Sequence, residues 1–286
     1  MSRLLGIGDN TVDVYLSQGT MYPGGNTVNV AALSTRLGHP ASYVGCVGND
    51  EAGALILQAL RAEGVDVTRC RQVPGLTSWS GIEHRDGDRA FVGSDAGVQG
   101  EWTLTDDDLA FVATHDVVHS SIYSRLDDDL PRIREAARVL SYDFSSEWTE
   151  PLLARVAPLL DVAFLSAGEG NTEDAWALAH HVAAHGARVV VITRGAQGSL
   201  ALSGHTRSLQ PTVPTQVVDT LGAGDALITA FLHSWTTHRD IPAALSAGAH
   251  EAARNCAVHG AFGHGVPVPA DHPALSARPL SQAALS

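Results

Sequence analysis

The sequence lacks lysine: all 18 of its lysine-or-arginine positions are arginine. Because a Walker-type phosphate loop, a Schiff-base enzyme and a pyridoxal phosphate enzyme each need a lysine amine, none of these mechanisms is open to the chain. A phosphate site must therefore use backbone amides, arginine or a metal ion. The formal net charge of −13 argues against nucleic acid and against an anionic membrane surface, so we predict neither as a partner.

Cysteines are few, and long apolar runs are missing. Cys46, Cys70 and Cys256 lie far apart without metal-finger spacing, so they indicate neither a disulfide framework nor a structural zinc site, and they fit a reducing cytoplasm. No apolar run reaches membrane-spanning length, and the first residues, MSRLLGIGDN, hold too short a run for a signal peptide. A hydrophobic fraction of 44% and a charged fraction of 17% are typical of a globular protein, which we expect in the cytoplasm.

Helical and strand patterns alternate along most of the chain. Strands are predicted at RLLGIG, ASYVGCVG, HDVVHSSI, VLSYDFS, DVAFLS and ARVVVITRG, with helical patterns between most of them and QGSLALSGHTRSL as an antiparallel continuation. This order predicts an α/β fold whose mostly parallel sheet is covered by helices on both faces.

Two segments depart from this alternation. Residues 75–100 have short alternating runs around Arg85-Asp86-Gly87-Asp88, a hairpin signal that predicts a small β subdomain. The segment from Val266 onward is rich in proline, alanine and serine without a period, so we expect it to pack loosely or not at all.

The stretch VDTLGAGDALI, residues 218–228, predicts an anion site. Glycines let the backbone turn and approach a ligand closely, and the helix that follows offers unpaired N–H groups and a positive dipole end. Asp225 stands out because a carboxylate beside a bound phosphate is repelled by it. We therefore expect this carboxylate to have a chemical task.

Three further loops carry polar or glycine-rich sequence: residues 8–13 (GDNTVD), 24–29 (GGNTVN) and 193–198 (TRGAQG). Ligands bind at the carboxyl ends of parallel strands, so we expect the four loops to converge. Taken singly, each of the three is also consistent with an ordinary turn, helix start or hairpin connection. GIGDN lacks the third glycine of a dinucleotide-binding motif, so we do not predict a dinucleotide site there. Among the histidines, His180, His181 and His185 have helical spacing, which we interpret as surface or core positions rather than as a metal site.

The segments GGNTVNVA and DTLGAGDALITAF resemble the two signature segments of the ribokinase (PfkB) family of carbohydrate kinases, and VGNDEAG and TRGAQGS stand in the family's order. The resemblance runs from Leu4 to about Gly265. It implies a ribokinase-like three-layer α/β/α domain over residues 1–265 with a β lid from about 11–22 and 75–100, followed by a tail over 266–286. Within the family, GDNTVDVY, HDVVHSSI, YDFSSEW and VHGAFGHG are most similar to bacterial fructoselysine 6-kinases.

The resemblance assigns roles to the loops. It implies that Asp225 is the base that takes the proton from a sugar hydroxyl, and that the amides of Gly222, Ala223 and Gly224 form an anion hole for the transferred phosphoryl group. The implied sugar-binding residues are Asp13, Gly24, Gly25 and Asn29, with Asn10 and Asp9 as weaker candidates. The implied ATP-binding residues are Thr193, Gly195, Gly198, Gly222 and Gly224.

The resemblance also implies ATP with Mg²⁺, and K⁺ near Asp219. The family's Asn-x-x-Glu motif reads Ser166-Ala167-Gly168-Glu169 here, which keeps the acid, Glu169, as an indirect Mg²⁺ partner but loses the asparagine. Lid edges in this family pair between subunits, which implies a homodimer. The implied reaction is transfer of the γ-phosphate of ATP to the 6-hydroxyl of fructoselysine or a related fructosamine. The alternatives are a kinase for ribose, fructose or a nucleoside, and a non-catalytic sugar or nucleotide sensor, which would have no need of Asp225.

Overall fold

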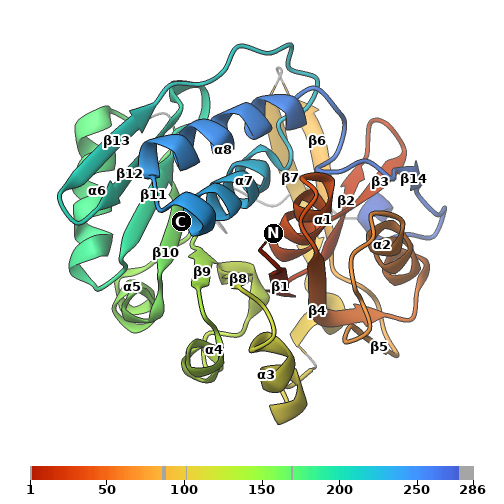
Figure 1. Cartoon of the computed structure of the whole chain (residues 1–286). Helices are drawn as coiled ribbons and strands as arrows, with labels where there is room; N and C mark the ends of the chain where they lie inside the picture. The colour runs from red at the N-terminus through yellow and green to blue at the C-terminus, as the bar shows by residue number, and fades with distance from the viewer. Residues whose placement is uncertain (1, 86–87, 101, 169, 277–286) are drawn as a thin grey trace.

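A nine-stranded sheet forms the centre of the computed structural model, which describes residues 2–85, 88–100, 102–168 and 170–276 (Figure 1). Its strands follow the order β13-β12-β11-β10-β9-β8-β1-β4-β5. All neighbours from β11 to β5 pair in parallel, whereas β12 and β13 are antiparallel. The strands are β1 (Leu4–Gly8), β4 (Ala41–Gly48), β5 (Arg71–Val73), β8 (Val117–Ser121), β9 (Leu140–Asp143), β10 (Val162–Ser166), β11 (Val189–Thr193), β12 (Ser199–Ser203) and β13 (Thr206–Gln210).

Helices cover both faces of this sheet, so the predicted α/β fold with three layers is confirmed (Figure 1). One face carries α1 (Asn26–Arg36), α2 (Glu51–Ala62), α7 (Ala223–His238) and α8 (Ile241–Asn255), and the other carries α3 (Asp106–Val112), α4 (Leu130–Ala136), α5 (Glu150–Val156) and α6 (Thr172–Ala184). Successive side chains of β1 point to opposite faces, as in any strand. Leu4 packs with Phe231 of α7, whereas Leu5 and Ile7 join the core beneath α3 to α6. Burial on both faces explains why these strands read as continuous apolar runs.

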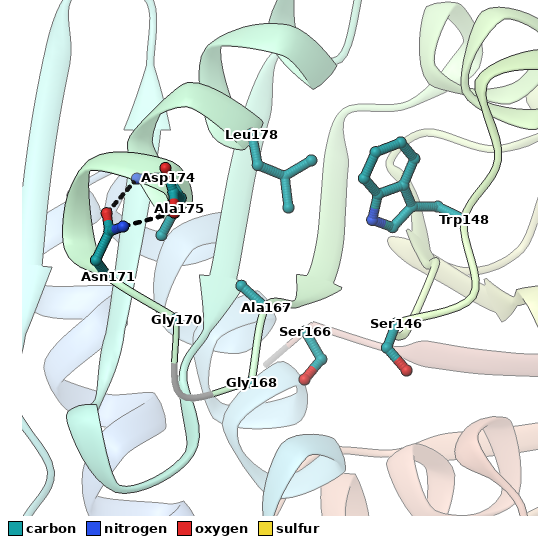
Figure 2. Close-up of a pocket in the computed structure, with 10 residues that line it drawn as sticks. All are labelled: Ser146, Trp148, Ser166, Ala167, Gly168, Gly170, Asn171, Asp174, Ala175 and Leu178. Carbon is teal, nitrogen blue, oxygen red and sulfur yellow. Dashed lines mark hydrogen bonds between the residues drawn. The ribbon is translucent and has the colours of Figure 1, made fainter. Parts of the chain in front are cut away.

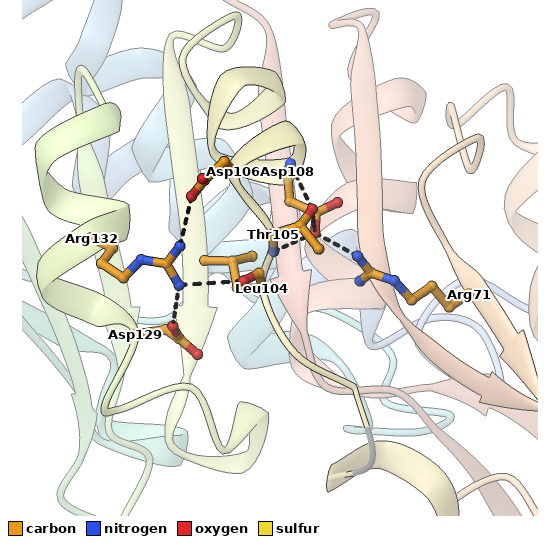
Figure 3. A network of polar contacts seen from close by, with 7 residues as sticks. All are labelled: Arg71, Leu104, Thr105, Asp106, Asp108, Asp129 and Arg132. Atoms are coloured by element: carbon orange, nitrogen blue, oxygen red, sulfur yellow. Dashed lines mark hydrogen bonds and ion pairs between the residues drawn. The ribbon is translucent and has the colours of Figure 1, made fainter.

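The start of α3 is fixed by a polar network (Figure 3). Thr105 and Asp108 form a capping box, in which the Asp108 amide donates to Thr105 Oγ1 at 3.2 Å and the Thr105 amide donates to Asp108 Oδ2 at 2.9 Å. Arg71 reaches the same carboxylate at 2.5 Å, and on the other side Arg132 pairs with Asp106. Burial alone would raise the pKa of Asp108, but the hydrogen bonds from Thr105 and Arg71 lower it. The network ties β5 to α3.

A second sheet of five strands, in the order β14-β3-β2-β6-β7, lies beside the first. It comprises β2 (Thr11–Tyr15), β3 (Thr20–Gly24), β6 (Trp79–Arg85), β7 (Asp88–Asp95) and β14 (Val266–Pro267). As predicted, β6 and β7 pair in antiparallel fashion. Asp86 and Gly87, at the predicted turn, lie outside the described residues. Among the helices that the structure describes, none has the length and apolar character needed to span a bilayer.

The expectation of loose packing after Val266 is wrong for residues 266–276. Val266 and Pro267 pair with β3, and Ala274 is buried. The His272 ring also stands edge-on to Trp79, with ring centres 6.1 Å apart. A two-residue strand is too short to show a period, which is why pattern analysis missed this contact. Residues 277–286 lie outside the described part of the chain.

Candidate active site

Two helices that are far apart in sequence meet at their N-terminal ends. Asp225, in the first turn of α7, accepts one side-chain hydrogen bond on each carboxylate oxygen, and both donors come from the first turn of α1. Asn26 Nδ2 donates to Oδ1 at 2.8 Å, and Asn29 Nδ2 donates to Oδ2 at 2.6 Å. The two glycine motifs of the sequence are therefore brought together, and the carboxylate predicted to be reactive faces residues of the early loops.

Glycine is required where these two helices begin. Gly25, which precedes α1, has φ of 102°, and a Cβ atom there would lie 2.6 Å from the Asn10 Cα atom. Gly222, which precedes α7, has φ of 76°, and a Cβ atom there would lie 2.7 Å from the Ala261 Cα atom. By contrast, a Cβ atom on Gly224 would meet nothing within 4 Å. The first turn of α7 therefore borders open space, as an anion site at a helix N-terminus requires.

Asn26 joins Asp225 to a second carboxylate. Its Nδ2 atom also donates to Asp143 Oδ2 at 3.1 Å, so the two amide hydrogens serve two acids. The Asn26 Oδ1 atom lies 2.8 Å from Nε2 of His119 and can only accept, so this nitrogen carries the His119 proton. Burial lowers the pKa of His119 to about 3, which keeps the ring neutral. His119 thereby fixes the orientation of the Asn26 amide.

Asp143 is the last residue of β9. In the sheet, this strand lies between β11 and β1, whose carboxyl ends lead into two of the predicted loops. Burial raises its pKa to about 7, and the charges of Asp225 and Asp9 act in the same direction, whereas the hydrogen bond from the Ser145 amide lowers it. Two carboxyl groups close enough to share one amide cannot both ionise freely. Protonation and charge at this site are therefore coupled.

Among the residues predicted to bind sugar, the buried oxygens Asn10 Oδ1 and Asn29 Oδ1 have no hydrogen-bond partner among the described residues; outside this set the same holds for Ser199 Oγ and Asn255 Oδ1. Asn10 and Asn29 are only 1% and 4% exposed, and their Nδ2 atoms are used, by Tyr43 and Asp225 respectively. A buried acceptor without a donor is unfavourable unless a ligand supplies one. Hydroxyl groups are donors that would satisfy both oxygens.

Of the other residues predicted to bind sugar, Asp13 and Gly24 lie together on paired strands. A Cβ atom on Gly24 would come within 2.2 Å of Asp13 Oδ2, so only glycine leaves that carboxylate in place. Asp9 is buried and accepts from Ser121 and Ser124 at 2.8 and 3.0 Å. Burial raises the pKa of Asp9 above its ordinary value. The hydrogen bonds from Ser121 and Ser124 act in the opposite direction but are the smaller effect. Its contacts hold the end of β1 against β8, and sugar binding by Asp9 stays a prediction.

The residues predicted to bind ATP divide between two places. Gly222 and Gly224 belong to the start of α7, whereas Thr193 ends β11 and Gly195 opens the short turn after it. Gly198 has a packing reason of its own, since its φ is 86° and a Cβ atom would lie 2.1 Å from the Gln210 carbonyl oxygen. Glu169 lies outside the described residues.

Asp219, predicted to lie near a monovalent cation, is a buried carboxylate that accepts several hydrogen bonds. Tyr15 Oη donates at 2.6 Å, and the amides of Leu221 and Gly260 donate at 3.0 Å each. These donors reach both oxygens, which is the bonding of a carboxylate that fastens the loop before α7 to β2. Cation binding near Asp219 stays a prediction.

A pocket of about 450 Å³ lies beyond the end of β10, toward α6 (Figure 2). Ser166, Ala167 and Gly168 form part of its lining, and Trp148 and Leu178 supply its apolar wall. On another side Asn171 caps α6 by accepting from the Asp174 amide at 2.8 Å. The pocket therefore borders the first three residues of the family motif that begins at Ser166. It lies on the opposite side of the sheet from α7.

Sequence reasoning missed three of the residues that surround Asp225: Asn26, His119 and Asp143. Asp143 ends a predicted strand of the parallel sheet, so the rule that ligands bind at the carboxyl ends of parallel strands would have found it. Asn26 directly follows the two glycines of the loop 24–29, and only this position in the sequence points to it. His119 lies in the predicted strand HDVVHSSI, with no motif around it. No pattern in the sequence links it to Asn26.

Comparisons with known proteins show the family to which the chain is similar. The model of the family described as pfkB family carbohydrate kinase matches residues 4–267. The chain is 42% identical over 269 residues to the fructosamine kinase FrlD of Bacillus subtilis, covering 93% of this chain and 94% of the relative. It is 36% identical to the fructoselysine 6-kinase of Escherichia coli, covering 92% and 100% respectively.

Two solved structures have the same fold. The ribokinase of Arabidopsis thaliana in complex with ribose and ATP has a TM-score of 0.79 at 21% identity, covering 91% of this chain and 94% of that one. A putative ribokinase II of E. coli in complex with ATP and Mg²⁺ has a TM-score of 0.77 at 23% identity, covering 92% and 95% respectively.

Proposed function

Because this chain belongs to the pfkB family of carbohydrate kinases, we propose that it transfers the γ-phosphate of ATP to the 6-hydroxyl of fructoselysine or a related fructosamine. The relatives named for fructosamine and fructoselysine span nearly the whole chain, which supports this substrate over free ribose, fructose or a nucleoside. The chemistry follows from the carboxylate at the start of α7.

In the proposed mechanism, Asp225 accepts the proton of the attacking hydroxyl as general base. The hydrogen bonds from Asn26 and Asn29 hold its carboxylate in one orientation. The amides of Gly222, Ala223 and Gly224 stabilise negative charge on the phosphoryl group, because the N-terminal amides of a helix and its dipole favour anions. A chain without lysine can carry out this reaction, since phosphoryl transfer depends on positioning and electrostatics.

The observation that carries the proposal is the Asn29 side chain. Its amide nitrogen donates to Asp225, while its oxygen is buried without a donor among the described residues. A hydroxyl group that donates to this oxygen would lie beside the carboxylate that is to deprotonate a sugar. We propose that Asn29 and Asn10 accept from sugar hydroxyls, with Asp13, Gly24 and Gly25 shaping the same subsite. Asp9 is a weaker candidate for the same subsite.

We propose that Thr193, Gly195 and Gly198 line the nucleotide site together with Gly222 and Gly224. Mg²⁺ bound to ATP would neutralise charge on the phosphate oxygens, with Glu169 as an indirect partner of the ion. That assignment rests on the family motif alone. We also propose that K⁺ binds near Asp219. Because the Asp219 carboxylate accepts from Tyr15 and from two main-chain amides, the main-chain oxygens of the same loop would have to supply ligands for the ion.

A substrate panel tests the proposed acceptor. The purified enzyme would be assayed by coupled ADP detection with ATP, Mg²⁺ and, in turn, fructoselysine, ribose, fructose and a nucleoside. We expect the highest kcat/KM with fructoselysine. Fast turnover of ribose together with no turnover of fructoselysine would refute the acceptor while leaving the kinase reaction intact. Failure to release ADP with any acceptor, despite sugar binding, would favour a non-catalytic sensor.

We also propose that the smaller sheet acts as a lid and pairs with a second copy through its edge. Phe91, on the edge strand β7, is 57% exposed, and an uncovered apolar edge strand favours association. Light scattering of the wild type and of Phe91→Asp would show a dimer that the substitution dissociates. An ATP-dependent kinase works where ATP is kept, so we propose the cytoplasm as its location.

A further inference from the structure

Glu150, His181 and His185 form a cluster on the face of the molecule opposite α7. Glu150 begins α5, His181 lies in the last turn of α6, and His185 directly follows that helix as its C-cap residue. Their ligand atoms all lie within 4.8 Å of one another. His181 Nε2 is 2.8 Å from Glu150 Oε2, and His185 Nε2 is 3.1 Å from Glu150 Oε1. Two imidazole nitrogens thus face one carboxylate.

The proton positions on His185 leave this arrangement incomplete. Its Nδ1 atom lies 3.0 Å from the His181 carbonyl oxygen, which can only accept, so Nδ1 must carry a proton. A neutral ring then turns the lone pair of Nε2 toward a carboxylate oxygen at 3.1 Å, which is repulsive. The contact is favourable only if a second proton or a metal ion binds Nε2.

The dimensions fit a small transition-metal ion. Bonds of about 2.0–2.2 Å from zinc to imidazole nitrogen and carboxylate oxygen place neighbouring ligands of a tetrahedron roughly 3.3 Å apart. The two observed nitrogen–oxygen distances, 2.8 and 3.1 Å, need only small side-chain adjustments to reach this spacing. Histidines four residues apart on one helix can bind one ion together. The carbonyl partner of His185 Nδ1 is the kind of contact that orients a metal-binding histidine.

We propose that Glu150, His181 and His185 bind a divalent transition-metal ion of the zinc type, at a site separate from phosphoryl transfer. Two imidazoles and one carboxylate favour Zn²⁺, Ni²⁺ or Cu²⁺ over Mg²⁺, which prefers oxygen ligands. The ion clamps the start of α5 to the end of α6. The histidine spacing alone did not indicate such a site, and the structure adds the carboxylate from another helix.

Trp148 provides a reporter next to the cluster. Its ring centre lies 6.4 Å from that of His181, and its side chain lines the pocket beyond β10 (Figure 2). A quenching ion such as Ni²⁺ bound at the cluster would therefore reduce Trp148 fluorescence.

The test uses the full chain, freed of metal by a chelator and titrated with ZnCl₂ in a calorimeter at pH 7.5. The variants are His181→Asn, His185→Asn and Glu150→Gln, and the control is His180→Asn, since His180 is exposed on the same helix but outside the cluster. Unfolding midpoints without metal check that every variant is folded. We expect one Zn²⁺ per chain in the wild type and the control, and binding weaker by about tenfold or more in each cluster variant.

Ni²⁺ titration gives an independent readout, with quenching expected in the wild type and His180→Asn but not in His185→Asn. Zinc binding that is equal in the wild type and His185→Asn would mean adventitious binding elsewhere and would overturn the proposal. So would a wild-type protein that binds no Zn²⁺, because the cluster would then be held by its polar side-chain contacts without a metal ion.

Discussion

Replacing Asp143 by asparagine should change how the stability of the protein depends on pH. Removal from water raises the pKa of this partly buried side chain to about 7, against an ordinary value of 3.8. Because the folded state holds the proton more tightly, ionisation of Asp143 opposes folding. The penalty is absent below about pH 4, grows as the pH rises toward 7, and is complete above 7 at roughly 4 kcal/mol. An asparagine side chain cannot ionise, so the variant loses this penalty.

The substitution also has a cost that does not depend on pH, since the new amide would face the Asn26 Nδ2 donor that now serves Asp143. The quantity to compare is therefore the difference in unfolding free energy between variant and wild type at two pH values, because the pH-independent cost cancels. Between pH 5 and pH 8 the free energy of unfolding of Asp143→Asn should rise relative to the wild type by about 2–3 kcal/mol.

Urea unfolding followed by circular dichroism at pH 5 and pH 8 measures this difference. Asp107→Asn, which changes an exposed carboxyl in α3, is the control and should show little pH dependence relative to the wild type. If Asp143→Asn differs from the wild type by the same free energy at both pH values, the carboxyl ionises without penalty. The coupling inferred between Asp143 and Asp225 would then be refuted.

Three further substitutions test the site and the core. Asn29→Ala removes a donor to Asp225 and the buried oxygen that we propose accepts from a sugar hydroxyl. A hydrogen bond to a charged group contributes about 1.5–3 kcal/mol, so kcat/KM should fall roughly ten- to hundredfold. An unchanged kcat/KM would contradict the proposed sugar subsite. Gly24→Ala places a Cβ atom 2.2 Å from Asp13 Oδ2, so steady-state kinetics should show a higher KM for the sugar with kcat less affected. Asp161→Ala removes a buried carboxylate that accepts from Arg134 and Arg188, at 2.5 and 2.8 Å, and from the Leu140 amide, and urea unfolding should show a loss of about 1.5–3 kcal/mol. The exposed pair partner Asp128 is the control, because Asp128→Ala should cost no more than about 1 kcal/mol, and equal losses would contradict the burial argument.

The fold was predictable because its strands are buried on both faces. Continuous apolar runs such as those of β1 and β11, separated by helical patterns, indicated a parallel sheet before any contact was known. The contact of β14 with β3 was not predictable, since two residues carry no period.

Some residues of the candidate site were likewise predictable from the sequence, and others were not. Gly25 and Gly222 were detectable because backbone geometry at these positions requires glycine, and Asp225 because an acid beside an anion site calls for an explanation. The bridge from Asn26 to Asp143, and the tautomer of His119 that orients it, depend on side chains from three separate elements. Such a relation exists only after folding, and a single sequence does not contain it.

Replacement of Asp225 tests the central claim most directly. Turnover of fructoselysine with ATP would be measured for the wild type, Asp225→Asn and Asp225→Ala, and sugar binding would be measured by calorimetry. We expect kcat to fall by about 10²–10⁴-fold, as for the loss of a general base, while the sugar still binds. Turnover that survives in both variants would show that this carboxylate does not take the proton, and the proposed mechanism would be wrong.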